Sequence, residues 1–91
     1  MNKHQSRLLN HMILSMQDYI DEKTDDFYVV VGILEGALDA SEIRYGRFID
    51  QWYDCWTPLE ARRAGEGVKV NRHEAVKELE AMKIFLLNVL V

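Results

Sequence analysis

Apolar residues recur at helical spacing along most of this chain. Between residues 2 and 22 they form one face: Leu8, Leu9, Met12, Ile13, Met16, Tyr19 and Ile20. Intervals of three and four residues are the period of an amphipathic helix with one buried stripe. The charges of this helix oppose its macrodipole. The basic residues at its start are Lys3 and Arg7, and the acidic residues at its end are Asp18, Asp21 and Glu22. Packing must therefore stabilise the helix, or the charges serve another purpose.

The segment from Phe27 to Leu34 fits either a helix or a strand. Its β-branched run is typical of a short buried strand, but the apolar pattern continues at helical spacing to Leu38 and no partner strand is evident. We therefore interpret it as a helix, capped by Thr24. The back of this helix carries small residues at four-residue spacing: Gly32, Gly36 and Ala40. A glycine inside a helix costs about 1 kcal/mol relative to alanine, a cost that close approach of another helix would offset.

Five of the nine aromatic residues fall within twelve positions: Tyr45, Phe48, Trp52, Tyr53 and Trp56. At about 100° per residue, all but Tyr53 share one face of a helix. We expect this helix to start at the capping pair Asp39 and Glu42 and to end before Pro58. The aromatic face predicts a core, with a peptide groove or ligand pocket as the alternative. Tyr53 and Tyr28 lie at the edges of their helices, either as exposed contact residues or as boundary tyrosines with a hydrated hydroxyl.

Pro58 also opens the sequence TPLE, which is typical of a helix start. We expect a separate short helix over residues 58–64, followed by the turn GEG. The capping pair Asn71 and Glu74 then starts a last helix that runs from Arg72 to the end of the chain. Its C-terminal half has a second apolar side: Ile84, Leu87 and Val91. Together these elements predict one all-α domain over residues 1–91, a four-helix bundle or compact helical array with one short extra helix after Pro58.

Charge and composition narrow the classes of function. The net charge of −4 and the pI of about 5.3 argue against a nucleic-acid-binding module, which needs a basic footprint. One cysteine forms no internal disulfide, so a reducing cytoplasm is the expected location. No apolar stretch approaches the roughly 20 residues of a membrane span, and no signal peptide is recognisable. We expect a cytoplasmic protein that does not bind membranes.

The sequence contains no motif for catalysis or for a cofactor. Acidic residues at helical spacing hold Mg²⁺ in helical nucleotide pyrophosphatases, but those enzymes use two acid pairs on facing helices. The first helix carries such acids, with Asp18 beside Asp21 and Glu22. The only other acid pair that faces one way, Asp50 and Asp54, lies on the side away from the aromatic face. Cys55 follows an aspartate, which disfavours a reactive thiolate. We therefore expect no enzyme, no cofactor and no metal, and keep a metal-dependent pyrophosphatase-like enzyme as the third alternative.

The first hypothesis is an acidic module that binds a basic protein, as an immunity-type or antidote-type inhibitor does. Its size, charge and helix count are similar to those of the colicin-nuclease immunity proteins, although no motif supports this resemblance. The expected partner-binding residues are Asp18, Asp21, Glu22, Asp25, Asp26 and Tyr28, with Asp50, Tyr53 and Asp54 as a second group. The alternative is a homo-oligomeric structural or regulatory subunit, such as a homodimer. Its expected interface is Gly32, Gly36, Ala40, Ile84, Leu87 and Val91.

Overall fold

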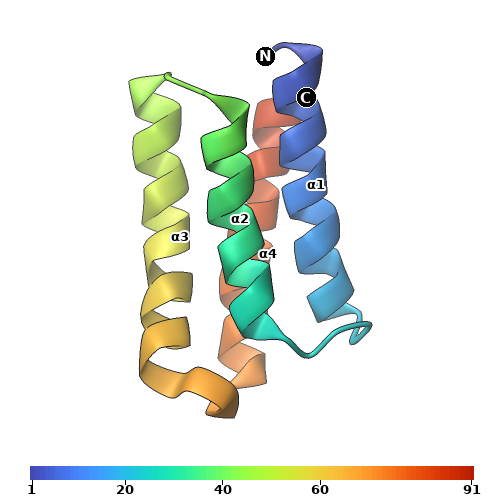
Figure 1. Cartoon of the computed structure of the whole chain (residues 1–91), viewed down its shortest axis with the longest axis vertical. Coiled ribbons are helices and arrows are strands. Elements are labelled where there is room, and N and C mark those ends of the chain that lie inside the picture. Colours follow the sequence, from blue (N-terminus) through green and yellow to red (C-terminus); the bar gives the residue numbers. More distant parts are fainter.

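Four antiparallel helices account for most of the chain in the computed structural model (Figure 1). The structure describes residues 1–91, apart from the side chain of Val68. The helices are α1 (Lys3–Ile20), α2 (Phe27–Ser41), α3 (Gly46–Glu66) and α4 (Arg72–Leu90), with a 3₁₀ helix, η1 (Gly67–Lys69), between the last two. The all-α prediction is confirmed. The segment that fitted either helix or strand is helical and forms the first half of α2.

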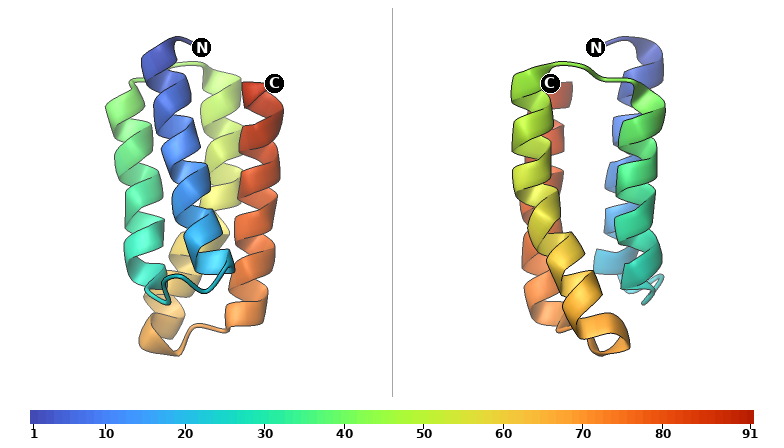
Figure 2. Two further views of the ribbon diagram at one scale, coloured as in Figure 1. Left: turned by 90° about the vertical axis from the view of Figure 1, so that its right-hand side faces the viewer. Right: turned by 60° about the vertical axis from the view of Figure 1, so that its left-hand side comes forward.

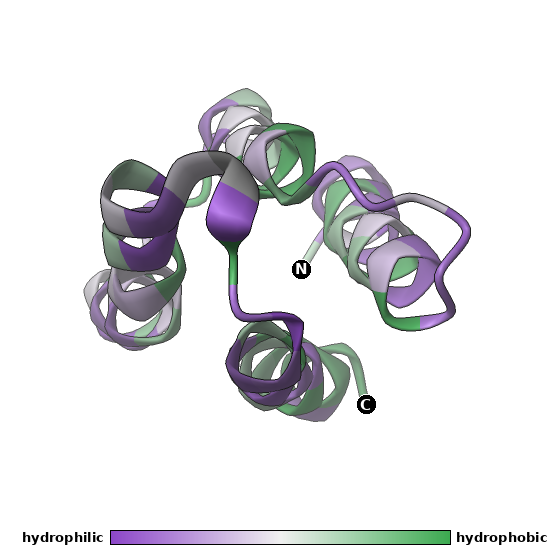
Figure 3. Ribbon diagram, turned by 90° about the horizontal axis from the view of Figure 1, so that it is seen from below, coloured by the Kyte–Doolittle hydropathy of each residue, from purple (hydrophilic) through white to green (hydrophobic). Residues whose placement is uncertain are grey.

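The helices form a ring in which each packs against its neighbours in the sequence, and α1 closes the ring against α4. Figure 3 shows the four helices around a common centre, and Figure 2 shows α1 beside α2 and α4. Consequently α1 lies diagonally across from α3, and α2 across from α4. This arrangement decides which predicted residues can meet.

The core is built from the residues that the periodicity selected. On α1 the buried side chains are Leu9, Met12, Met16 and Tyr19, and on α4 they are Ala75, Leu79, Met82 and Leu86. On α2 and α3 the larger ones include Phe27, Val31, Leu34, Phe48, Trp52 and Trp56. Each helix therefore buries one stripe toward the common centre, as the hydrophobic effect requires.

Side-chain caps fix three helix starts. Asn2 and Gln5 form a capping box at α1, and Asn71 accepts from the backbone of Glu74 at 3.2 Å at the start of α4. The cap of α2 is Asp26, which accepts from the backbone of Val29 at 3.1 Å. The prediction of Thr24 was wrong by two residues, because the Thr24 hydroxyl instead accepts from the backbone of Asp26 at 3.2 Å.

The expected start of the aromatic helix at Asp39 was also wrong. Helix α2 continues to Ser41, whose hydroxyl donates to the Leu38 carbonyl at 2.6 Å and accepts from the Ile43 amide at 3.2 Å. The buried Ser41 therefore ends α2, and Glu42 follows in the left-handed conformation (φ 55°). Helix α3 starts only at Gly46.

No separate helix begins at Pro58, so the prediction of a short extra helix over residues 58–64 was wrong. Pro58 lies inside α3, which runs unbroken to Glu66 and bends midway (Figure 2). Proline removes one helical hydrogen bond and usually costs about 3 kcal/mol in a helix interior. The buried side chains of Trp56 and Leu59 hold α3 against the core on both sides of it. Gly67, at φ 58°, ends α3, because a left-handed residue there favours glycine.

Candidate functional site

The acidic residues predicted to bind a partner gather at the lower end of the bundle in Figure 1, where α1 ends and α2 begins. We call this group the acidic corner: Asp18, Asp21, Glu22, Asp25 and Asp26. All five are exposed. The loop between them is held by backbone hydrogen bonds from Lys23 and Thr24 to the Asp18 carbonyl, at 2.8 and 3.3 Å. The short loop therefore keeps the end of α1, with Asp18 and Asp21, close to the start of α2, with Asp25 and Asp26.

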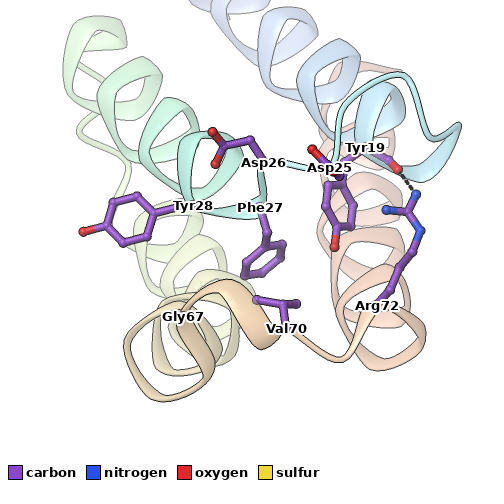
Figure 4. A pocket seen from close by; sticks show the side chains of 8 residues that line it. All are labelled: Tyr19, Asp25, Asp26, Phe27, Tyr28, Gly67, Val70 and Arg72. Carbon is purple, nitrogen blue, oxygen red and sulfur yellow. Dashed lines mark hydrogen bonds between the residues drawn. The ribbon is translucent and has the colours of Figure 1, made fainter.

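A cavity of about 660 Å³ opens beside the acidic corner (Figure 4). Its lining comes from three separate parts of the chain: Tyr19 from α1, Asp25, Asp26, Phe27 and Tyr28 around the start of α2, and Gly67, Val70 and Arg72 before and within α4. Three of the predicted partner-binding residues, Asp25, Asp26 and Tyr28, line this lower cavity. Asp18, Asp21 and Glu22 lie outside it.

Among the described lining residues, Arg72 alone is an arginine or lysine, and its charge is engaged elsewhere. Its guanidinium lies over the Tyr19 ring, 4.3 Å from the centroid, and donates to the carbonyls of Tyr19 and Ile20. It also lies 3.6 Å from a carboxylate oxygen of Glu22. A cation at these carbonyls stabilises the C-terminus of α1. The two aspartates of the cavity are thus left without this counterion.

The two aspartates have different environments. Asp26 uses one oxygen to cap α2, whereas no hydrogen bond or ion pair among the described residues engages the Asp25 carboxylate. The N-terminus of α2 places its partial positive charge beside both aspartates. Asp25 and Asp26 make this edge of the cavity acidic.

Tyr28 presents its ring as well as its hydroxyl, because 62% of the residue is exposed. The guanidinium of Arg63 lies 4.6 Å from the ring centroid and is paired with Glu60 at 2.6 Å. This contact orients the Tyr28 ring from the α3 side. Of the two boundary tyrosines, Tyr28 is therefore the exposed one, whereas Tyr53 is half-buried against Trp52 and Trp56.

The second predicted group lies at the opposite end of the bundle. Asp50 and Tyr53 line a smaller cavity of about 450 Å³, together with Leu38, Asp39, Glu42, Ile43, Arg44, Gly46 and Ile49. Asp54 is exposed on α3 but is not part of that lining. The two groups of predicted partner-binding residues therefore do not form one surface.

The aromatic face of α3 is mainly core. Phe48, Trp52 and Trp56 are buried, and the Trp56 indole donates to the Val31 carbonyl of α2 at 3.3 Å. The indole N–H of the fully buried Trp52 has no acceptor among the described residues. Tyr45 is the exception at 59% exposure, because it precedes the helix and does not follow its periodicity.

The residues predicted for an oligomer interface lie on two diagonal helices. Gly32, Gly36 and Ala40 face solvent on α2, and Ile84, Leu87 and Val91 are exposed on or just after α4. A Cβ added at Gly36 would meet nothing within 4 Å, and one at Gly32 only the tip of Arg63 at 3.9 Å. No helix of the same chain therefore makes the close approach that the glycines led us to expect.

The structure shows no convergent set of metal ligands. No group of three His, Cys, Asp or Glu side chains in the described part of the chain is arranged to hold an ion. Asp50 and Asp54 lie on α3, diagonal to the acid pairs of α1. At Cys55, burial raises the pKa of the thiol and the charge of Asp54 raises it further. Both effects make this thiol less nucleophilic at neutral pH.

The sequence did not point to Phe27, Val70 or Arg72 as parts of a site. Phe27 fits the core pattern of α2, and Arg72 stands at the start of α4 like any first-turn residue. Val70 and Arg72 join the site because α4 packs beside α1, a contact between the two ends of the chain. Phe27 joins it because its ring meets that of Tyr19 on α1. The helix patterns carry no signal for that pairing.

Comparison of the chain with protein-family models, with curated proteins and with solved structures finds no match. The site must therefore be interpreted from its own geometry. No helix in the described part of the chain has the length and apolar character that a bilayer crossing requires.

Proposed function

We propose that this chain is a protein-binding module that receives a basic segment of its partner at the acidic corner. The observation that carries the proposal is the lower cavity, where two carboxylates that form no ion pair with any described residue border an exposed aromatic ring. Its volume lies within the range of about 300–1,000 Å³ that is usual for binding sites. No catalytic group or metal is needed for this role.

An arginine or lysine side chain of the partner has the chemistry that the cavity requires. Its aliphatic stem would pack on Phe27 and Tyr28, since long cationic side chains cover apolar surface while the charge stays outside. Its cationic head would reach Asp25, whose carboxylate is unengaged, and the free oxygen of Asp26. Charge-assisted hydrogen bonds of this kind are roughly twice as strong as neutral ones.

The remaining acids of the corner would act mainly on the rate of association. Asp18, Asp21 and Glu22 are exposed and lie outside the cavity. Exposed charges steer a basic partner toward the site and are screened by salt. An inhibitor of a basic protein, of the immunity or antidote kind, is the biological role that this chemistry fits best.

The test uses peptides as probes. A set of short peptides, each with one central arginine or lysine, is titrated while amide signals are followed by NMR. We expect the shifts to concentrate at Phe27, Tyr28, Val70 and Arg72. The variant Asp25→Asn/Asp26→Asn should abolish them, and Asn at position 26 preserves the helix cap. The matched control is Asp50→Asn/Asp54→Asn. No shift at millimolar peptide, or shifts unchanged in the first variant, would refute the proposal.

A further inference from the structure

The charges on the solvent side of α1 are ordered so that this side is self-complementary when it is turned end to end. Six exposed residues follow one another at intervals of three and four positions: Lys3, Arg7, Asn10, Leu14, Asp18 and Asp21. At the helical period these residues form one strip along the solvent side of α1. The strip begins with two cations, ends with two anions and has a leucine near its middle.

Few interactions within the described part of the chain engage these charges. No ion pair among the described residues involves Lys3, Arg7 or Asp18, and Asp21 only accepts from the amide of Gln17 at 2.9 Å. The order also opposes the macrodipole of α1, whose first turn has no acid and whose last turn has no base. The strip therefore weakens α1 slightly in an isolated chain.

The neighbouring face of α2 is uncharged at its centre. Val29 is 51% exposed, and Gly32, Gly36 and Ala40 continue the line as small residues. The isolated chain does not need glycine at position 36, since a Cβ there would meet nothing within 4 Å. Leu14, on the strip of α1, is 64% exposed. Val29, Gly36 and Ala40 thus give the outer side of α2 an apolar and small surface. Gly32, in contrast, lies toward Arg63 of α3.

Contacts at both ends hold α1 and α2 in a fixed register. At one end the His4 ring lies 3.1 Å from the Ala40 carbonyl, and at the other the rings of Tyr19 and Phe27 meet edge to face at 5.5 Å. These contacts fix how far along α1 each residue of α2 lies. A second molecule can therefore use both helices at once.

We propose that the α1/α2 face binds a second copy of this chain in an antiparallel, two-fold symmetric dimer. A half-turn about an axis across the middle of the strip brings Arg7 opposite Asp18 of the second copy, and Lys3 opposite Asp21 of the second copy. Because a two-fold interface repeats every contact, each pair occurs twice. The proposal does not depend on the peptide-binding role, because Asp25 and Asp26 remain outside the charge pairs. The two roles share Asp18 and Asp21, which would steer a basic partner only in the monomer.

The same rotation places the small residues of α2 where they would allow a close approach between the two molecules. It places α2 against α2 of the second copy, with Val29 near Gly36 of the other molecule. A missing side chain lets a neighbouring backbone or side chain approach closely. A stable interface buries about 800 Å² per partner, which is about one-seventh of the 5565 Å² surface of this chain.

The decisive experiment separates the two halves of the strip. One variant, Lys3→Glu/Arg7→Glu, makes the strip wholly acidic, and another, Asp18→Lys/Asp21→Lys, makes it wholly basic. Each alone should dimerise at least about 30-fold more weakly than the wild type, because four attractions become repulsions. Mixed together they should form a 1:1 heterodimer with a Kd within about tenfold of the wild-type value. Sedimentation equilibrium at protein concentrations from micromolar to millimolar measures the self-association of each variant and the Kd of the heterodimer.

Unfolding does not explain the expected loss. Each variant places charges that the macrodipole favours at the end of α1 that it changes. At a concentration where every form is monomeric, each should therefore unfold at the same or a higher temperature than the wild type. Matched controls carry the same reversals near α3: Arg44→Glu/Arg47→Glu and Asp50→Lys/Asp54→Lys. Each should dimerise like the wild type, and mixing the two should favour the heterodimer no more than random exchange of subunits does.

Gly36→Leu tests the α2 part of the face. The added side chain should weaken the dimer while the monomer stays folded, whereas Gly65→Leu, also at a position with no neighbouring atom within 4 Å, should leave dimerisation unchanged. The proposal is overturned if the wild type remains monomeric at millimolar concentration. It is also overturned if the two strip variants stay apart on mixing, or if Gly36→Leu dimerises like the wild type.

Discussion

Arg62 joins the ends of α3 and α4 through a forked ion pair, and its removal gives a quantitative test of how the bundle is held together. The Nε and Nη2 atoms donate to the two carboxylate oxygens of Glu78 at 2.5 and 3.2 Å. The Nη1 atom donates to Glu66 at 2.7 Å. These hydrogen bonds, led by those to Glu78, raise the pKa of the guanidinium above its ordinary value. Arg62→Met removes the fork and keeps most of the apolar stem.

Burial decides the magnitude. The side chains of Arg62, Glu78 and Glu66 are 16%, 26% and 33% exposed. An exposed ion pair contributes about 0.2–1 kcal/mol, and removing one partner of a buried pair costs about 3–5 kcal/mol. A mostly buried fork between two helices lies between these limits, so we expect a loss of about 2 kcal/mol. At about 4–8 °C per kcal/mol for a domain of this size, the Tm should fall by roughly 10 °C.

Urea unfolding followed by far-UV circular dichroism measures the change. The double variant Arg62→Met/Glu78→Gln should be less destabilised than the sum of the two single variants, with a coupling of about 1–2 kcal/mol. The control is Lys77→Met, which removes the exposed pair with Glu74 at 3.8 Å and should change stability by less than about 0.5 kcal/mol. If Arg62→Met loses no more than this control, the fork contributes nothing and the reasoning from burial fails.

Three smaller effects follow from single residues. Glu42→Gly should raise the free energy of unfolding by about 0.5–1 kcal/mol in urea titrations, since φ 55° strains a side-chain-bearing residue; an unchanged value would contradict that strain. A hydrogen bond from the Asn71 amide lowers the pKa of Glu66 below its ordinary 4.5. The ionised Glu66 carboxylate therefore stabilises the fold fully above about pH 4.5, and this contribution is lost as the pH falls through the folded-state pKa. Glu66→Gln should accordingly make the free energy of unfolding, measured by urea titration, fall less steeply on the acid side. Iodoacetamide should modify Cys55 at pH 8 at least about threefold more slowly than an unstructured cysteine, and Asp54→Asn should partly restore the rate.

Helical periodicity was enough to predict the fold class and most of the core. The stripe of Leu9, Met12 and Met16 is buried because spacing alone assigns residues to one face of a helix. The β-branched run in α2 folds as a helix because helical spacing places its apolar residues on one face, which is buried in the core. In this chain the tertiary packing overrides the strand propensity of valine and isoleucine.

Helix boundaries were predicted less well, and the reasons are tertiary. Pro58 has the local signature of a helix start, yet the burial of Trp56 and Leu59 carries α3 through it. Asp39 has the spacing of a cap, yet the buried Ser41 side chain ends the preceding helix two residues later. Tertiary packing overrides local signals of this kind when burial of the flanking apolar residues favours a different helix boundary.

The candidate site was half accessible from the sequence. A cluster of acids near a helix start predicts that Asp25 and Asp26 lie together at the surface. The cavity itself needs Val70 and Arg72, whose position depends on how α4 packs against α1. The peptide-binding hypothesis remains a prediction.

The lower cavity has walls from three segments that meet only when the bundle is closed: the end of α1, the start of α2 and the stretch before and into α4. Any opening that moves α1 away from α4 therefore removes the binding surface. A ligand that recognises this cavity binds only the closed form and raises its free energy of unfolding by RT ln(1 + [L]/Kd). Amide hydrogens in the middle of α1 and α4, far from the cavity, should then exchange more slowly when it is occupied. In such a small bundle, occupancy at one end would be measurable as protection along the whole length of the helices.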